Sequence, residues 1–203
     1  MQTVDFFYGL GSRYSYLAST QIEALERDTG CRVVWRPLSS VDLMALHGRS
    51  PFAGEPVSGQ YDWDYRRRDA EAWAAYYRVP YVEPAPFVVD PRLFAIACQA
   101  AGQLGAVRDY SRRMFGAIFV DHATVDRECC LRLAEKAGLD PDRFARLMDD
   151  ASVAAEVRRT TEEAHRRGAF GVPTFFAGET MIWGNDRLPL LRHHLMRAAR
   201  GRR

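Results

Sequence analysis

The stretch Val4-Asp-Phe-Phe-Tyr-Gly-Leu-Gly-Ser-Arg13 decides the fold of this chain. It begins with β-branched and aromatic residues that stop at Gly9, a pattern typical of a short strand followed by a turn. Apolar residues then recur at helical spacing from Tyr14 to Gly30, so a helix follows the turn. Arg32-Val-Val-Trp-Arg36, closed by Pro37, reads as a second strand. A strand, a helix and a strand in this order predict a βαβ unit with two parallel strands.

The other end of the chain returns to β-structure. Pro173-Thr-Phe-Phe-Ala177 and Thr180-Met-Ile-Trp183 predict a hairpin around Gly178-Glu179, and a helix is expected from about 186 to 199. Between the two ends, loop composition covers residues 39–61 and a proline-rich, extended stretch covers 79–91. Helical patterns cover about 63–77, 91–104, 107–120 and 125–137, and 140–167 as one bent helix or two.

This order predicts an α/β fold of the thioredoxin type, βαβ–ββα, with a large all-helical insertion after the first unit. Residues 1–38 and 168–203 are expected to form the thioredoxin-like domain. Residues 39–167 are expected to form the helical insertion domain.

Composition excludes several classes of protein. The chain has 203 residues, 47% hydrophobic and 27% charged, with a net charge of +2 and no basic stripe, so no nucleic-acid partner is expected. No apolar run is long enough to cross a membrane, and the N-terminus lacks the features of a signal peptide, which predicts a cytoplasmic protein. The four cysteines form no C-x-x-C pair and are expected to be buried, unreactive thiols. No metal-ligand spacing occurs, and no functional role is assigned to the five histidines.

Three segments carry candidate chemistry. Ser12 precedes a helix, where it is either only an N-cap or part of an anion site. Val172-Pro173 precedes a strand; X–Pro bonds are mostly trans, but a cis bond would turn the backbone of Val172 toward a peptide-like ligand. In the loop Trp183-Gly-Asn-Asp-Arg187, Asn185 or Asp186 either caps the last helix or joins Arg187 in binding a ligand's charged groups.

Together these segments resemble a known family. Phe7-Tyr-Gly-Leu-Gly-Ser-Arg-Tyr-Ser-Tyr-Leu-Ala18, Gly168-x-Phe-Gly-Val-Pro-Thr174 and Trp183-Gly-Asn-Asp-Arg-Leu188 are similar to motifs of the 2-hydroxychromene-2-carboxylate isomerases. Those enzymes are relatives of kappa-class glutathione transferases and DsbA-type oxidoreductases. Further similarity lies in Tyr65-x-x-x-Asp69-x-x-x-Trp73-Ala with Val79-Pro80, and in Glu135-x-Ala-Gly-Leu-Asp140, so the resemblance spans the whole chain.

The resemblance implies a glutathione-dependent cis–trans isomerase acting on aromatic keto acids of the 2-hydroxychromene-2-carboxylate and trans-o-hydroxybenzylidenepyruvate type, as in naphthalene-like catabolism. Ser12 takes the position of the catalytic serine. The implied glutathione-binding residues are Ser12, Val172, Pro173, Trp183, Gly184, Asn185 and Asp186, with Arg13, Tyr65 and Arg187 as further anchors. The hypothesis for the chemistry is that the serine hydroxyl stabilises a glutathione thiolate, and that the sulfur, rather than the serine, attacks the substrate.

Three positions depart from the family pattern. The family commonly has Asp at position 9, Pro at position 13 and Lys at position 62, where this chain has Gly9, Arg13 and Asp62. The lysine belongs to the ligand site, and one of the arginines at 66–68 is a candidate replacement. Two alternatives stay open: a kappa-like glutathione transferase and a non-catalytic thioredoxin-fold binding protein. A homodimer is expected by analogy with the family.

Overall fold

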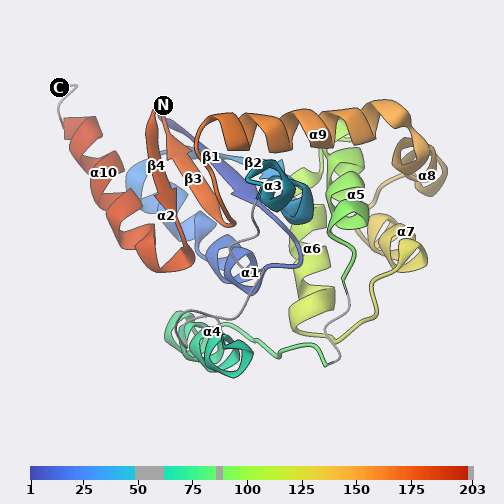
Figure 1. The fold of residues 1–203 in the computed structure, drawn as a ribbon, viewed down its shortest axis with the longest axis horizontal. Helices are drawn as coiled ribbons and strands as arrows, with labels where there is room; N and C mark the ends of the chain where they lie inside the picture. The colour runs from blue at the N-terminus through green and yellow to red at the C-terminus, as the bar shows by residue number, and fades with distance from the viewer. Residues whose placement is uncertain (49–61, 86–88, 201–203) are drawn as a thin grey trace.

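A computed structural model describes residues 1–48, 62–85 and 89–200 (Figure 1). Its centre is a four-stranded sheet in the order β2-β1-β3-β4. β1 (Thr3–Tyr8) runs parallel to β2 (Arg32–Pro37) and antiparallel to β3 (Thr174–Ala177), and β4 (Thr180–Trp183) extends the sheet as a hairpin with β3. The predicted βαβ and hairpin units are therefore confirmed, and so is the thioredoxin-like fold.

The described residues also form ten α-helices, some packed on the sheet and others on neighbouring helices. The βαβ unit contains α1 (Arg13–Thr20) and α2 (Ile22–Thr29), and the hairpin leads through the 3-10 turn η2 (Asn185–Arg187) to α10 (Leu188–Arg200). The helices inserted between β2 and β3 are α3 (Ser40–Leu46), α4 (Trp63–Tyr77), α5 (Pro91–Gln103), α6 (Val107–Phe119), α7 (Arg127–Lys136), α8 (Pro141–Asp149) and α9 (Ala151–Arg166). None of the helices in the described part of the chain is long and apolar enough to cross a membrane.

Alternating residues of β1 supply two hydrophobic cores, as the two-residue period of a strand requires. Phe6 and Tyr8 face the larger core, which continues into α1, α5 and α6, whereas Phe7 faces a smaller one beneath α3 and α9. The hydroxyl of Tyr8 lies 2.5 Å from Ser111 Oγ of α6, which ties the sheet to the insertion. The larger core contains residues of both the thioredoxin-like part and the helical insertion, so it does not separate them. The domain boundaries at 38/39 and 167/168 therefore stay a prediction.

The structure corrects the predicted helices in two places and decides between two alternatives in a third. The first helix is two helices that meet at Gln21, because the Ser19 and Thr20 hydroxyls bond back to carbonyls of the preceding turn and compete with the helical ladder. Within the predicted loop 39–61, residues 40–46 form α3, capped by Ser39; residues 49–61 lie outside the described part. The stretch 140–167 is two helices, since Asp150 ends α8 and its carboxylate caps α9.

Candidate active site

Ser12 stands at the point where the loop after β1 opens α1. Its backbone N–H donates to the carbonyl of Gly9 at 3.0 Å, which closes the loop into a turn. Its hydroxyl oxygen accepts the N–H of Ser15 at 3.2 Å, so the predicted N-cap is confirmed. A helix N-terminus concentrates unpaired N–H groups and partial positive charge, which favours an anion at this place.

The hydroxyl of Ser12 also faces the segment before β3. It donates to the carbonyl of Val172 at 3.4 Å, a long and therefore weak hydrogen bond that a better acceptor can replace. The Val172–Pro173 bond is cis, whereas the general preference for trans X–Pro bonds had favoured the other isomer. The carbonyl of Pro173 accepts the N–H of Gly184 at 3.0 Å. The fold thus brings together all three segments that the sequence singled out.

Two close approaches by glycine keep the helical insertion near Ser12. A Cβ on Gly9 would lie 3.3 Å from Cβ of Ser40, at the start of α3. A Cβ on Gly11 would lie 3.1 Å from a methyl carbon of Val89, just before α5. Ser40 and Val89 therefore border the site. No motif marks either residue individually, because the approach depends on tertiary packing.

Trp183 covers one side of the site. Its side chain is 38% exposed, and its ring packs at 4.9 Å, centroid to centroid, against Phe170. Gly171 lies directly beneath the indole: a Cβ there would stand 2.9 Å from Nε1 of Trp183, closer than real contacts allow. Gly184 has a φ of +105°, which disfavours a side chain at that position. The position of Trp183 therefore depends on glycine at both 171 and 184.

The loop after β4 holds one buried amide and one surface ion pair. Asn185 is 2% exposed, and its Nδ2 finds no hydrogen-bond partner among the described residues. Its backbone carbonyl accepts the hydroxyl of Tyr77 at 3.0 Å, which fixes the loop to α4. Asp186 and Arg187 bind each other at 2.8 Å, and both are about half exposed. The 3-10 turn follows Gly184 and has no side-chain cap, and capping of the last helix by Asn185 or Asp186 stays a prediction. The ion pair is weak enough for a ligand to open it.

Arg13 is an almost fully buried cation beside Ser12. Its Nη2 lies 2.6 Å from the carboxylate of Glu83, and its guanidinium lies 5.2 Å from the ring centroid of Trp63. Glu83 also accepts the hydroxyl of Tyr81. The charge of Arg13 is therefore matched inside the protein, which makes it a structural link between α1 and the segment after α4. No motif in the sequence marks Glu83 as a neighbour of Arg13.

Arg66, one of three consecutive arginines in α4, reaches Tyr14 of α1. Its guanidinium lies 5.7 Å from the ring of Tyr14 and 5.4 Å from that of Trp63, both within cation–π range. Asp62, which stands where the family has lysine, is the N-cap of α4 and accepts the N–H of Tyr65 at 2.8 Å. Tyr65 itself is half exposed on the surface of α4.

The protein's own thiols do not supply a nucleophile to this site. All four cysteines are unpaired and buried, as expected. Burial raises the pKa of Cys98 and of Cys130 to about 12, and it also raises the pKa of Cys31 and of Cys129. Since the thiolate is the reactive form, none of these side chains is active at neutral pH. A sulfur nucleophile at Ser12 would have to come from a ligand.

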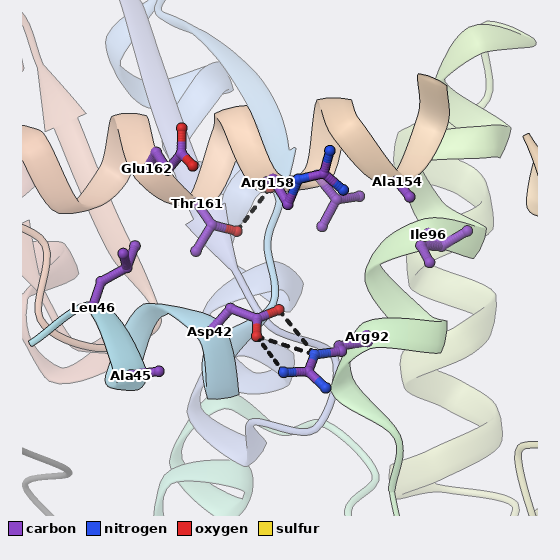
Figure 2. A pocket seen from close by; sticks show the side chains of 10 residues that line it. Asp42, Ala45, Leu46, Arg92, Ile96, Ala154, Arg158, Thr161 and Glu162 are labelled. Carbon is purple, nitrogen blue, oxygen red and sulfur yellow. Dashed lines mark hydrogen bonds and ion pairs between the residues drawn. The ribbon is translucent and has the colours of Figure 1, made fainter. Parts of the chain in front are cut away.

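Two cavities lie elsewhere on the molecule. One of about 540 Å³ lies between α3, α5 and α9, where Asp42 and Arg92 form an ion pair across its edge at 2.6 Å (Figure 2). The other, of about 640 Å³, lies between α2, α4 and α10 and is lined by Trp73, Tyr76 and Tyr77. Neither includes Ser12 among its described lining residues. By family analogy, the loops around 39–60 and 80–92 are expected to line a substrate pocket between the insertion and the thioredoxin part. These loops fall partly on residues outside the described ranges.

Comparison with known proteins places this chain in a family. Residues 3–196 match the DSBA-like thioredoxin domain. The chain is 30% identical over 196 residues to 2-hydroxychromene-2-carboxylate isomerase of Sphingobium xenophagum, covering 96% of this chain and 98% of the relative. The chain therefore belongs to the family of DSBA-like thioredoxin proteins that includes the 2-hydroxychromene-2-carboxylate isomerases.

A solved structure and a more distant relative agree with that placement. The structure of a 2-hydroxychromene-2-carboxylate isomerase superposes with a TM-score of 0.86 at 28% identity, covering 98% of this chain and 97% of that one. Glutathione S-transferase kappa 1 of Rattus norvegicus is 27% identical over 210 residues, covering 96% of this chain and 91% of the relative. These findings support an isomerase, within a family that is related to kappa transferases.

Proposed function

We propose that this protein is a glutathione-dependent cis–trans isomerase of aromatic keto acids of the 2-hydroxychromene-2-carboxylate and trans-o-hydroxybenzylidenepyruvate type. The observation that carries the proposal is the hydroxyl of Ser12 at the N-terminus of α1, facing Val172 in a protein whose own thiols are buried. This arrangement suits a thiolate brought by a ligand. The curated isomerase relatives supply the reaction class.

The described residues fit glutathione in three respects. Val172 lies two residues before β3, outside the sheet ladder, so its backbone is placed for a peptide-like partner. Asn185 has a buried amide nitrogen without a described partner. Asp186 and Arg187 offer a carboxylate for the ammonium group and a guanidinium for a carboxylate once their weak ion pair opens. Pro173, Trp183 and Gly184 complete the proposed binding surface.

When bound, glutathione would supply a thiolate able to add reversibly to the substrate's conjugated double bond, so that rotation about the resulting single bond becomes possible. The role of Ser12 is to donate its hydroxyl proton in a hydrogen bond to that sulfur, in place of the weak bond to Val172. The N-terminus of α1 adds favourable partial charge. Both effects favour thiolate over thiol and therefore lower the pKa of the bound thiol.

The carboxylate groups of the proposed ligands, glutathione and an aromatic keto acid, need a cation near α1. We assign this role to Arg66. It lies over the rings of Tyr14 and Trp63, on the side of α4 that meets α1. Arg13 is already matched by Glu83 and is assigned a structural role. Tyr65, half exposed on the same helix, remains a proposed further anchor.

Isothermal titration with glutathione, followed by product analysis, tests the proposal. Binding is expected, and so is interconversion of the two substrate isomers without consumption of glutathione. The full-length kappa relatives favour one second candidate, a transferase, which would instead form a conjugate and use up glutathione. A binding protein without catalytic activity would show neither product, and failure to bind glutathione at millimolar concentration would exclude both enzymes. The cytoplasmic location and the homodimeric state also stay proposals.

A further inference from the structure

An open groove rich in aromatic side chains lies between α2, α4 and α10. Its volume is about 640 Å³, which is within the usual range for sites that bind small molecules. Three rings of α4, those of Trp73, Tyr76 and Tyr77, line it on one side. Leu25 of α2 and Leu188 of α10, both almost fully buried, line it as well. None of the residues assigned to glutathione is among its described lining residues, so this groove is a second place to look for a ligand.

The rings of α4 hold one another in place. The centroid of the Trp73 ring lies 5.6 Å from that of Tyr76, with the planes nearly perpendicular at 89°. It lies 5.3 Å from that of Tyr77 at 41°. Both separations are in the range in which aromatic pairs attract. Tyr76 is 75% exposed, so a flat aromatic ligand that covered its ring would remove apolar surface from water.

The groove also carries a positive charge. Among its described lining residues, Arg192 is the one charged side chain, and no acidic residue lines the groove. Arg192 contacts Asp28 at 3.0 Å, and Asp28 is shared with Arg27 at 3.6 Å, so two guanidinium groups stand against one carboxylate. The excess of positive charge favours an anion beside Arg192.

Two polar side chains of the lining have hydrogen-bond donors to offer. The guanidinium of Arg192 is 45% exposed and has five N–H groups, more than its contact with Asp28 uses. The amide of Gln21 donates to Thr20 Oγ1 at 2.9 Å with one N–H group and has a second. A planar guanidinium binds a carboxylate well, because two parallel N–H groups match its two oxygens.

We propose that this groove binds a small aromatic carboxylate. The aromatic ring of the ligand packs against Trp73 and Tyr76, and its carboxylate meets Arg192. A neutral aromatic compound would leave the guanidinium unused, and an aliphatic acid would cover the rings less well. The rings and the charge together therefore define the chemical class of the ligand.

The groove borders the loop that follows β4. The hydroxyl of Tyr77 donates to the carbonyl of Asn185 at 3.0 Å, and Leu188 follows the 3-10 turn η2 directly. Figure 1 shows α10, which this loop leads into, beside α2. A ligand in the groove would thus contact the elements that hold the loop. The inference itself is independent of the proposed isomerase activity.

Isothermal titration of the full chain with 2-naphthoate, in the absence of glutathione, tests the proposal. A dissociation constant of about 0.1–1 mM is expected for a ligand of this size. Affinity should fall about five- to tenfold in Tyr76→Ala and about tenfold or more in Arg192→Gln. The matched control is Arg197→Gln, an exposed arginine of the same helix outside the described lining, which should bind like the wild type. Thermal unfolding of each variant verifies that it is folded.

Two further probes test the class of ligand. Naphthalene-2-methanol keeps the rings and lacks the charge, whereas cyclohexanecarboxylate keeps the charge and lacks the aromatic rings. Each should bind about tenfold more weakly than 2-naphthoate. Added salt should weaken the binding of 2-naphthoate and have little effect on the alcohol, because only the acid depends on a charge at the surface.

The variant Arg66→Gln separates this site from the proposed substrate site. Binding in the groove should persist in Arg66→Gln, even if the proposed isomerase function is wrong. Binding that is lost in Arg66→Gln but unchanged in Tyr76→Ala and Arg192→Gln would overturn the assignment, and so would an equal loss in Arg197→Gln.

Two other results would overturn the proposal as well. One is the absence of an isotherm at about 10 mM 2-naphthoate, well above the expected dissociation constant. The other is a groove occupied by a second copy of the chain. In that case sedimentation would show a dimer that Tyr76→Ala converts to monomer, and the wild type would not bind 2-naphthoate.

Discussion

Replacing Ser12 with alanine should change the acidity of bound glutathione more than its affinity. A hydrogen bond to a charged acceptor contributes about 1.5–3 kcal/mol, and 1.36 kcal/mol corresponds to about one pKa unit. Ser12→Ala should therefore raise the pKa of the bound thiol by about 1–2 units, toward the value of about 8.5 that is usual for a free thiol. At pH 6.5 the fraction of thiolate, and with it turnover at saturating glutathione, should fall about tenfold or more. Near pH 9.5 the variant should approach the wild type, because both thiols are then ionised.

The assay is the ultraviolet absorbance of the thiolate, titrated on the protein–glutathione complex, together with the pH profile of kcat. Ser15→Ala is the matched control: it changes a serine in the same helical turn and keeps the backbone N–H that Ser12 accepts. Loss of the N-cap should also cost about 1 kcal/mol of folding stability, so thermal unfolding is followed in parallel. An unchanged thiol pKa and an unchanged kcat at pH 6.5 would refute the role assigned to Ser12.

Three further predictions follow from other contacts. Gly171→Ala places a Cβ 2.9 Å from the Trp183 indole and should weaken glutathione binding in a titration. Gly116→Ala in α6, where a Cβ meets nothing within 4 Å, should leave glutathione binding unchanged. Equal losses of binding in both variants would contradict the role of the Gly171–Trp183 contact. The Arg92 guanidinium holds the pKa of Asp42 below its usual value. The ion pair therefore stabilises the folded protein at pH values above the pKa of Asp in the unfolded chain. This stabilisation is lost as the pH falls through the lowered pKa of the folded state. Asp42→Asn should therefore cost at most about 1 kcal/mol at pH 7 by urea unfolding, with no difference from wild type in strong acid, and a difference that persists in acid would contradict it. The four thiols should react with a disulfide reagent only after unfolding, since burial raises their pKa; rapid labelling of the native protein would show that a cysteine is accessible.

The sheet could be predicted from sequence because its strands carry their own signals. Phe6 and Tyr8 alternate with residues that face the other core, and Pro37 and Gly178 mark ends and turns. The break at Gln21 was missed because it depends on hydroxyls that bond back within a continuous apolar pattern. Helix α3 was missed because the loop-like composition after residue 46 outweighed the short capped segment before it.

The site was predictable only where a motif marked it. Ser12, Val172 and the segment from Trp183 to Arg187 were found because each lies at a strand end beside a glycine or proline. Their meeting is visible only in the fold, and so are Ser40 and Val89, which have no motif of their own.

The most direct test of the central claim is to follow both substrate isomers by chromatography, with and without glutathione. The proposed function predicts that the protein brings either isomer to the same equilibrium ratio, that this requires glutathione, and that the amount of glutathione stays constant throughout. Equilibration at the same rate without glutathione would contradict the claim, and so would no acceleration at saturating glutathione.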